Sequence, residues 1–235
     1  MSEQDKPSIV FCHGLWADGS CFSKLIPTLR AEGHECITAE YGLDSHQGDI
    51  DCTIRALGRV SSPAILVGHS YGGSVITGAG TDDRVVGLVY ICALAPDETE
   101  TSQGQQDKFP VTDVFSHIEV ADGRVWLLRS GIDFFCGDLT PEEKELVWAT
   151  AMSPVADLFT QPTPGTAWRT KPSAYIVGSN DRTVNPVLER AAAERMGAAT
   201  YEIASDHVPM MSHPETVLEA IRNLVSSLQG SPTPV

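Results

Sequence analysis

The feature that most constrains the fold of this chain is a sharp turn between an apolar run and a segment of small residues. The apolar run AILVG ends at Gly68, and GHSYGG (Gly68–Gly73) follows it directly. Gly68, Ser70 and Gly72 fit the pattern G-x-S-x-G, in which the serine takes a strained backbone conformation between a strand and a helix. Glycines on either side of the serine keep neighbouring segments from clashing. Ser70 is therefore the candidate nucleophile, and the N-terminus of the following helix favours negative charge beside it.

Short apolar runs alternate with helical segments along most of the chain. Runs that read as buried strands occupy residues 8–12, 34–41, 63–68, 84–94, 171–178 and 199–204. Apolar residues at helical spacing lie between several of these runs, and the last such stripe extends from Pro214 to about Leu228. This order predicts an α/β fold, with a mostly parallel sheet of about six strands and helices on both faces.

The alternation stops between residues 97 and 168. This segment contains no convincing buried strand, but it has polar turns, aromatic residues and helical candidates such as PEEKELVWATAM from Pro141. At about 70 residues it is too long for a plain connection. We therefore expect residues 1–235 to form a single domain that carries a mainly helical cap, inserted at about residues 97–168, over the strand ends.

The charge balance narrows the classes of partner. The chain has 31 acidic and 16 basic side chains, a net charge of −15, which argues against nucleic acid and anionic membrane surfaces as partners. No apolar run approaches the roughly 20 residues of a membrane span, and the polar N-terminus MSEQDKPS is unlike a secretory signal. Six scattered cysteines without zinc-like spacing suit a reducing compartment. We expect a cytoplasmic protein, monomeric or homodimeric, that acts on a small molecule.

The stretch ASDHVPMMSHP supplies the candidate base. His207 directly follows the last apolar run, which places it in a loop at the carboxyl edge of the sheet. A serine hydroxyl needs such a base to take its proton. His213 precedes Pro214, where the last helix begins, and is interpreted as a helix-entry residue. A metal site formed by Asp206 and the two histidines is the alternative, although this spacing does not suggest a ligand shell.

An acid must orient the histidine, and elbow-type enzymes place it between the serine and the histidine in the chain. Asp181, in VGSNDRTVNP, lies three residues beyond Gly178 at the end of the fifth apolar run. It is the leading candidate to hold the tautomer of His207 and to stabilise the imidazolium. Asp97, after the fourth run, is a rival. Asp206 is a further one, but adjacent side chains in an extended loop point apart.

Acyl transfer also needs hydrogen-bond donors for the oxyanion. The backbone N–H of Tyr71, directly after Ser70, is one candidate. The loop HGLWADGS after the first run supplies the other, for which we choose the N–H of Leu15.

Aromatic residues are candidates for the wall of a substrate pocket. Trp16 lies beside the proposed oxyanion hole, and the cap contributes Phe134 and Trp168. Further candidates from the cap are Phe135, Trp148 and Phe159. Packing between cap and core is the alternative for each of them. A mostly apolar pocket predicts a small hydrophobic or aromatic carboxylic ester, or a lactone, as substrate.

Four stretches together, FCHGLW, LVGHSYGG, GSNDRTVNP and SDHVPMMSHP, resemble the α/β-hydrolase superfamily. The run SDHVPMMSHP is similar to the histidine loop of its small-cap branch, which holds plant methylesterases, hydroxynitrile lyases and bacterial esterase relatives. The resemblance implies an acyl-enzyme on Ser70, with His207 as base and then acid and Asp181 as the orienting acid. It implies an oxyanion hole at Leu15 and Tyr71, and neither metal nor cofactor.

The chain departs from the hydroxynitrile lyases of that branch at two places. Those enzymes have a lysine directly after the catalytic histidine and a threonine in the loop after the first strand, whereas this chain has Val208 and, in the loop, Gly14 and Leu15. Ester hydrolysis is therefore favoured over cyanohydrin cleavage. Carbon–carbon bond hydrolysis, lyase or perhydrolase chemistry on the same triad, a ligand receptor with slow turnover, and a cofactor-free oxygenase remain as alternatives.

Overall fold

The computed structural model describes residues 6–61 and 63–230, and a six-stranded parallel sheet forms its centre. The strands are β1 (Ser8–Cys12), β2 (Cys36–Ala39), β3 (Ala64–His69), β4 (Val85–Ile91), β7 (Ser173–Gly178) and β8 (Ala199–Ile203). They stand in the order β2-β1-β3-β4-β7-β8, and each neighbouring pair is parallel. The predicted fold class is confirmed. Residues 1–5 of the stretch MSEQDKPS lie outside the described part of the chain.

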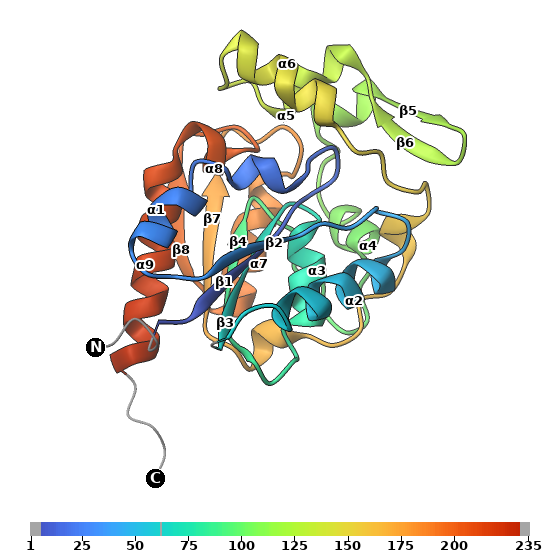
Figure 1. Cartoon of the computed structure of the whole chain (residues 1–235). Helices are drawn as coiled ribbons and strands as arrows, with labels where there is room; N and C mark the ends of the chain where they lie inside the picture. Colours follow the sequence, from blue (N-terminus) through green and yellow to red (C-terminus); the bar gives the residue numbers. More distant parts are fainter. Residues whose placement is uncertain (1–5, 62, 231–235) are drawn as a thin grey trace.

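Helices cover both faces of the sheet (Figure 1). One face carries α1 (Ile26–Ala31) and α9 (Pro214–Gly230), and the other carries α2 (His46–Leu57), α3 (Gly72–Ala79) and α7 (Pro186–Met196). The short helices η2 (Gly19–Phe22) and α8 (Pro209–Ser212) lie in loops. α9 buries the predicted apolar stripe, with Val217, Leu218, Ile221, Leu224 and Val225 all inaccessible or nearly so. An amphipathic helix of this kind gains its stability from packing that stripe on the sheet.

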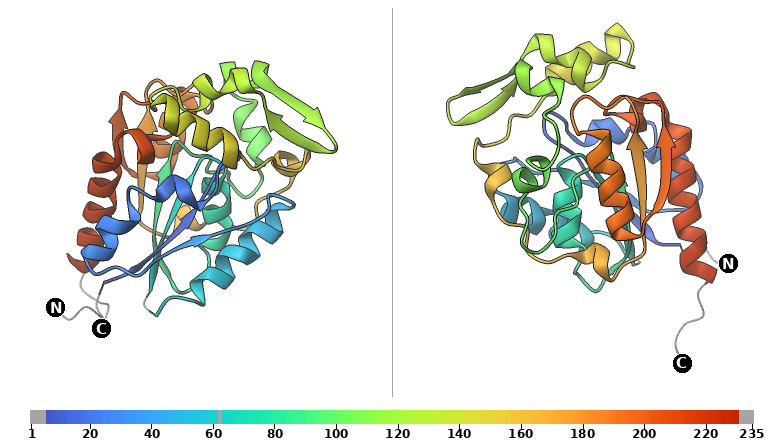
Figure 2. Two further views of the ribbon diagram at one scale, coloured as in Figure 1. Left: turned by 45° about the horizontal axis from the view of Figure 1, so that its top comes forward. Right: turned by 180° about the vertical axis from the view of Figure 1, so that it is seen from behind.

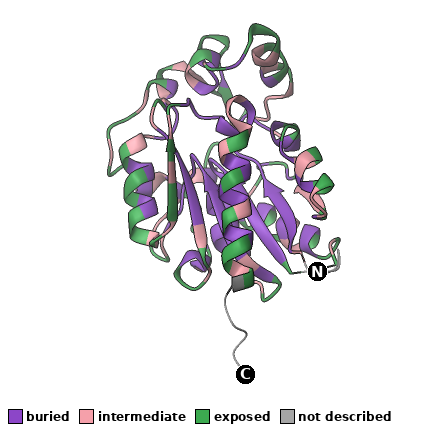
Figure 3. Ribbon diagram, turned by 90° about the vertical axis from the view of Figure 1, so that its left-hand side faces the viewer, coloured by how far each residue is buried: buried purple, intermediate pink, exposed green. Residues whose placement is uncertain are grey.

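The central strands form the core. Every residue of β1 and of β3 is buried, which explains why these strands read as continuous apolar runs rather than alternating ones. Figure 3 shows buried residues concentrated in the sheet and exposed residues on the outer sides of the helices.

The segment between β4 and β7 contains the predicted cap. Its elements are α4 (Ser102–Gln106), η3 (Asp113–His117), β5 (Ile118–Ala121), β6 (Arg124–Leu127), η4 (Arg129–Gly131), α5 (Ile132–Phe135), α6 (Pro141–Thr150), η5 (Leu158–Thr160) and η6 (Ala167–Arg169). Figure 2 shows α5, α6 and the β5–β6 hairpin lying beyond one edge of the sheet. The hairpin was not predicted. It turns at Asp122 and Gly123, whose φ angles of 52° and 75° are those that an Asp-Gly hairpin turn favours.

The register of the strands brings four loops together at the edge under the cap. Cys12 pairs with Gly68, and Gly178 pairs with Ile203. The carboxyl ends of β1, β3, β7 and β8 therefore lie at one edge of the sheet. In open parallel sheets this edge is where ligands bind, because the loops that follow the strands converge there.

Candidate active site

The turn after β3 holds Ser70 in a left-handed backbone conformation, with φ of 56°. Its backbone is fixed on both sides: its N–H donates to the carbonyl of Ile91 at 3.0 Å, and its carbonyl accepts from the N–H groups of Gly73 and Leu94 at 3.0 and 3.1 Å. A non-glycine residue at positive φ costs of order 1–3 kcal/mol, and such strain persists only where surrounding structure imposes it. The hydroxyl of Ser70 is thereby presented at the sheet edge, directly before α3.

Glycines allow two chain segments to approach this turn. A Cβ atom on Gly72 would lie 2.2 Å from the carbonyl oxygen of Cys12, and one on Gly14 would lie 2.6 Å from Cβ of Ser70. Either distance is impossible for a side chain. The loop after β1 therefore packs directly against the nucleophile, which requires glycine at both positions.

His207 and Asp181 form a buried pair. Nδ1 of His207 lies 2.6 Å from Oδ2 of Asp181, and both side chains are inaccessible to solvent. Oδ1 of Asp181 accepts from the backbone N–H groups of Thr183 and Val184 at 2.6 and 3.0 Å. The carboxylate is thus held by three donors and fixes the imidazole with Nδ1 as its proton-bearing atom.

The other ring nitrogen of His207 remains available as a proton acceptor. Nε2 is buried and has no hydrogen-bond partner in the described part of the chain. His69, the chain neighbour of Ser70, places its Nε2 2.8 Å from the carbonyl oxygen of His207, with the two rings 4.6 Å apart. The structure therefore brings the three predicted residues Ser70, Asp181 and His207 to one edge of the sheet.

The two rival acids have other partners. Asp97 accepts from the guanidinium of Arg169 at 2.8 Å, and this hydrogen bond lowers the pKa of the Asp97 carboxyl. Asp206 accepts from Arg182 at 3.3 Å, while its own N–H donates to Asp138. Among the described residues, Asp181 is the carboxylate that His207 contacts, as the order along the chain predicted.

His213 lies apart from this pair. Its Nδ1 is 2.9 Å from the hydroxyl of Ser212, and it is partly exposed between α8 and α9. This is the position predicted for a helix-entry residue, and among the described residues His213 does not group with His207 and Asp206 as possible metal ligands.

Two backbone N–H groups lie on the segments that meet at Ser70. Within residues 6–61 and 63–230, neither the N–H of Leu15 nor that of Tyr71 donates a hydrogen bond. Unpaired buried N–H groups are rare in folded proteins. Two of them on the segments that meet at a nucleophile can stabilise an oxyanion.

The side chain of Tyr71 belongs to a second buried network on the other side of the elbow. Its hydroxyl donates to Oδ2 of Asp49 at 2.8 Å and lies 2.9 Å from Nδ1 of His46. Nε2 of His46 is 3.0 Å from the hydroxyl of Thr163. Burial raises the pKa of Asp49 to about 6 and lowers that of His46 to about 4. This network joins α2, the elbow and the segment before β7, and no local sequence pattern indicates it.

Two further histidines next to the site are buried and neutral. Nδ1 of His13 lies 2.9 Å from the carbonyl oxygen of Gly14. Nε2 of His69 lies 2.8 Å from the carbonyl oxygen of His207. Burial lowers the pKa of both imidazoles. They shape the loops around Ser70, and within the described residues neither ring contacts a carboxylate as that of His207 does.

A mostly apolar cavity opens at Ser70. Besides Ser70 itself, its polar lining residues are Gln106 and Thr183, and the others are Leu15, Trp16, Leu94, Val114, Phe115, Phe159 and Val184. Gln106, Val114 and Phe115 come from α4 and η3, which sequence analysis did not assign to the site. Nothing in their local pattern distinguishes them from surface or packing residues.

The aromatic residues predicted to line the pocket do not all do so. Trp16 lines the cavity, but Phe134 stacks on His117 at 4.4 Å and Trp168 donates from Nε1 to the carbonyl of Pro96 at 3.1 Å. Phe135 instead lies beside His207, with the two rings 5.3 Å apart. Adjacent residues of a helix point in different directions, so the aromatic pair in α5 presents only one ring to the site.

Trp16 also ties the oxyanion loop to the cap. Its N–H donates to the carbonyl of Met152 at 2.9 Å, and its indole Nε1 donates to that of Val125 at 3.0 Å. Its φ angle of 54° lies in the left-handed region, where the backbone of a non-glycine residue is strained.

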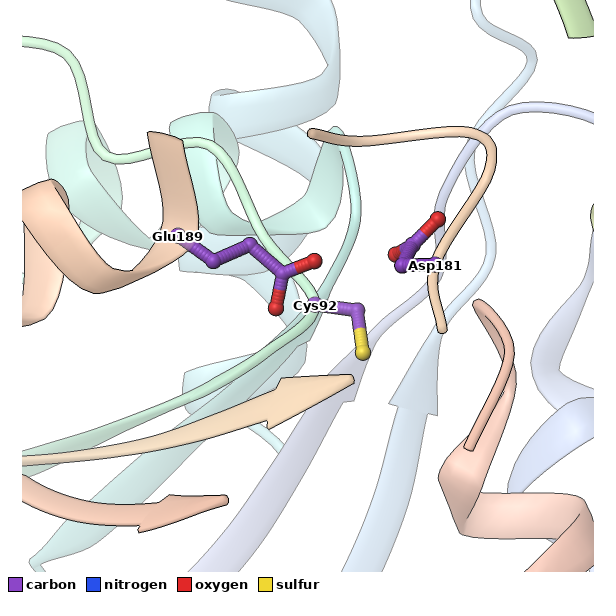
Figure 4. Close-up of side chains that lie close together, drawn as sticks. All are labelled: Cys92, Asp181 and Glu189. Atoms are coloured by element: carbon purple, nitrogen blue, oxygen red, sulfur yellow. The ribbon is translucent and has the colours of Figure 1, made fainter. Parts of the chain in front are cut away.

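Next to the His207–Asp181 pair, Cys92, Asp181 and Glu189 place one donor atom each within 4.8 Å of one another (Figure 4). A cation needs deprotonated ligands. Burial raises the pKa of the Cys92 thiol and of the Glu189 carboxyl well above their usual ranges, and Asp181 is already engaged by His207. These residues therefore do not fit a metal ion.

A family model described as the alpha/beta hydrolase family matches residues 9–220. The chain belongs to the alpha/beta hydrolase family. This hydrolase is 27% identical over 195 residues to the alpha/beta hydrolase nvfD of Aspergillus novofumigatus, covering 74% of the chain and 76% of that protein. It is 26% identical to a pimeloyl-[acyl-carrier protein] methyl ester esterase of Stenotrophomonas maltophilia over 94% of each chain.

The structural comparison agrees with the family. The crystal structure of polyneuridine aldehyde esterase superposes on this hydrolase with a TM-score of 0.80 at 17% identity, covering 94% of this chain and 99% of the other. At that identity the likeness shows the fold. The resemblance expected from the four sequence stretches is confirmed. In the described part of this hydrolase, no helix combines the length and apolar character that crossing a membrane requires.

Proposed function

We propose that this hydrolase is a carboxylic-ester hydrolase that forms an acyl-enzyme on Ser70. The observation that carries the proposal is the buried contact of 2.6 Å between Asp181 and His207, beside a serine in a strained strand-to-helix turn. The name of the Stenotrophomonas relative, a methyl ester esterase, supports the same reaction class.

In the first half-reaction, Ser70 is acylated and the alcohol is released. Nε2 of His207 takes the proton of the Ser70 hydroxyl as Oγ bonds to the ester carbonyl carbon. The carbonyl oxygen becomes an oxyanion that accepts from the N–H groups of Leu15 and Tyr71. The intermediate then collapses, the bond to the alcohol oxygen breaks, and His207 returns its proton to the leaving alcohol. Asp181 remains ionised and stabilises the imidazolium throughout.

The second half-reaction repeats these steps with water. His207 takes a proton from a water molecule, whose oxygen attacks the acyl carbonyl, and the proton then goes to Oγ of Ser70 as the acid departs. Over the two half-reactions, one ester and one water molecule give one acid and one alcohol, and His207 carries each proton.

The cavity lining favours a small hydrophobic or aromatic ester, or a lactone. Its walls are apolar, with Trp16, Phe115 and Phe159 as the large surfaces. Nε2 of Gln106 is buried at this cavity without a partner among the residues that the structure describes. A buried donor of this kind is satisfied by an acceptor on a ligand or by water, so we propose that the substrate presents an oxygen to it.

We also propose that the protein works in the cytoplasm, as a monomer or a homodimer, on small molecules alone. All six cysteines are free thiols, as a reducing compartment would keep them.

Labelling of the nucleophile tests the proposal. A series of p-nitrophenyl esters should give burst kinetics, and a serine-reactive phosphonate should leave one adduct, on Ser70, in the mass spectrum. Ser74→Ala is the matched control, because Ser74 is a buried serine in the first turn of α3 that contacts Ser102, and it should neither carry the adduct nor limit turnover. Full activity in Ser70→Ala would refute the proposal.

A further inference from the structure

Glu189 is a buried carboxyl group directly behind the acid of the triad. It lies on the first half of α7 and is inaccessible to solvent. Its Oε2 accepts from the N–H of Gly178, the last residue of β7, at 3.0 Å. Figure 4 shows its carboxyl group directed toward Asp181, with the Cys92 thiol beside both. Burying a glutamate without a cation is costly, so its presence needs an explanation.

The contacts decide which of the two carboxyl groups carries the charge. Asp181 accepts from three donors, on His207, Thr183 and Val184, whereas Glu189 accepts from the N–H of Gly178 and from the Cys92 thiol, a weak donor. Two carboxylates this close cannot both be ionised at ordinary cost. The group with more donors keeps its charge, so Asp181 is the carboxylate and Glu189 is the acid.

The position of the proton on Glu189 follows from its second oxygen. Oε1 is buried and receives no hydrogen bond from any described residue. The carboxyl group of Glu189 nevertheless hydrogen-bonds to the side chain of Asp181. An oxygen without a donor, next to a carboxylate, is satisfied only if it carries the proton itself. Burial, which raises the pKa of Glu189 well above its usual range, acts in the same direction.

The other titratable groups around Glu189 do not supply a compensating charge. Cys92 and Tyr175 are buried neutral groups that burial keeps protonated by raising the pKa of each. Arg190 is the neighbouring residue on α7, but it points outward and pairs with Glu202 at 2.6 Å.

We propose that protonated Glu189 is a positioning residue of the triad: it donates from Oε1 to Asp181 and anchors Gly178 through Oε2, which directs the Asp181 carboxylate at Nδ1 of His207. This role rests on the function proposed for Ser70, His207 and Asp181. It also limits the negative charge behind His207 to one. A second charge would favour the imidazolium, and His207 could then not accept the proton of Ser70.

Two substitutions separate the hydrogen bonds from the charge. Glu189→Gln keeps a carbonyl oxygen for Gly178 and an N–H for Asp181, and it should retain the greater part of kcat. Glu189→Leu removes both bonds and should lower kcat about 10- to 100-fold, the range for loss of one hydrogen bond to a charged group, with KM little changed. Glu194→Gln, at an exposed position of the same helix, is the control and should match the wild type.

Two readouts distinguish a positioning role from a merely structural one. In p-nitrophenyl ester hydrolysis, the acid limb of the kcat/KM profile should lie at the same pH in Glu189→Gln and the wild type. In infrared difference spectra at mildly alkaline pH, the wild type should show the C=O band of a protonated carboxylic acid, which Glu189→Gln lacks.

Each result can overturn the proposal. A missing infrared band, or an acid limb that moves to lower pH in Glu189→Gln, would show that Glu189 is ionised. Undiminished kcat in Glu189→Leu would show that it positions nothing. If Glu189→Leu does not fold, the two measurements on Glu189→Gln still decide the question. If the wild type hydrolyses no ester, the proposed function fails, whereas the infrared band continues to report on Glu189.

Discussion

Two buried networks flank Ser70, and they use similar residues for different ends. On one side, the ring of His207 contacts the carboxylate of Asp181. On the other side, the ring of His46 contacts the hydroxyl of Tyr71, which in turn donates to the carboxylate of Asp49. Each network contains a histidine and a carboxylate, and each attaches to a segment next to the nucleophile.

The networks differ in what they leave unpaired. Both ring nitrogens of His46 have partners, in Tyr71 and Thr163, whereas Nε2 of His207 has none among the described residues. A fully satisfied network fixes structure, while a network with a free acceptor can receive a proton. We infer that the network of His46, Tyr71 and Asp49 supports the elbow, whereas that of His207 and Asp181 performs the proposed chemistry; we call them the supporting and the catalytic network. Substitutions in the two networks should therefore affect different measurements.

The largest expected effect is on turnover, in the catalytic network. His207→Ala should lower kcat about 10⁶-fold and Asp181→Asn about 10⁴-fold, because the base or its correct tautomer is lost. Initial rates with a p-nitrophenyl ester measure this. Combining Ser70→Ala with His207→Ala should cost little more than either change alone, since the two residues act as one unit. Additive losses would mean that they act separately.

The next effect is on stability, in the supporting network. Tyr71→Phe removes the hydroxyl that Asp49 and His46 share and leaves a buried carboxylate oxygen short of a donor. The free energy of unfolding should fall by about 1–3 kcal/mol, measured by urea denaturation. Turnover should change less than about tenfold, because the backbone N–H at the oxyanion hole remains. A loss of rate as large as that of Asp181→Asn would remove the distinction between the networks.

The pH dependence of the free energy of unfolding is a further test of the difference between the two networks. Burial raises the pKa of Asp49 from 3.8 to about 6, so the folded protein holds this proton more tightly than the unfolded chain does. The contribution of Asp49 to the free energy of unfolding should therefore decline as the pH rises from about 4 through about 6.

Asp49→Asn isolates this contribution. Relative to the wild type, the variant should gain about 1–2 kcal/mol across that window, a range that allows for partial solvent screening. His46, whose lowered pKa works in the opposite direction, is present in both proteins and cancels. Urea unfolding at several pH values provides the comparison. Parallel curves for the two proteins would show that Asp49 does not titrate there.

The smallest effects should come from residues near the triad that belong to neither network. Asp206→Asn and His213→Ala should each change kcat less than about threefold, since Asp206 contacts Arg182 and His213 contacts Ser212. A loss above about 100-fold in Asp206→Asn would restore Asp206 as the orienting acid.

The sequence predicted the parts of the site that depend on local pattern and chain order. Ser70 follows from the glycines around it, and Asp181 and His207 follow from their places after successive strands. The supporting network was not predicted, because Tyr71, Asp49 and His46 meet only after α2 packs beside α3. Glu189 likewise reads as an ordinary polar residue of a helix, and only its burial reveals a role.

The cap was the least predictable region. Its β5–β6 hairpin turns on Asp122 and Gly123, a pair that does favour hairpins, but the flanking runs are short and mostly half-buried or exposed, so their apolar signal is weak. Phe134 was predicted to lie at the site, but its neighbour Phe135 lies beside His207 instead, and this difference has another cause. Which of two adjacent aromatic rings faces the site depends on the rotation of α5, which sequence pattern alone does not specify.

The two hydrogen bonds of Trp16 link the shape of the substrate to the rate of its reaction. The same residue is bonded to the cap at Met152 and Val125 and is covalently joined to Leu15, whose N–H borders Ser70. An ester bulky enough to displace the cap would therefore pull on the oxyanion donor itself. Discrimination between esters would then appear in kcat as well as in KM, and the enzyme would select by size during the chemical step.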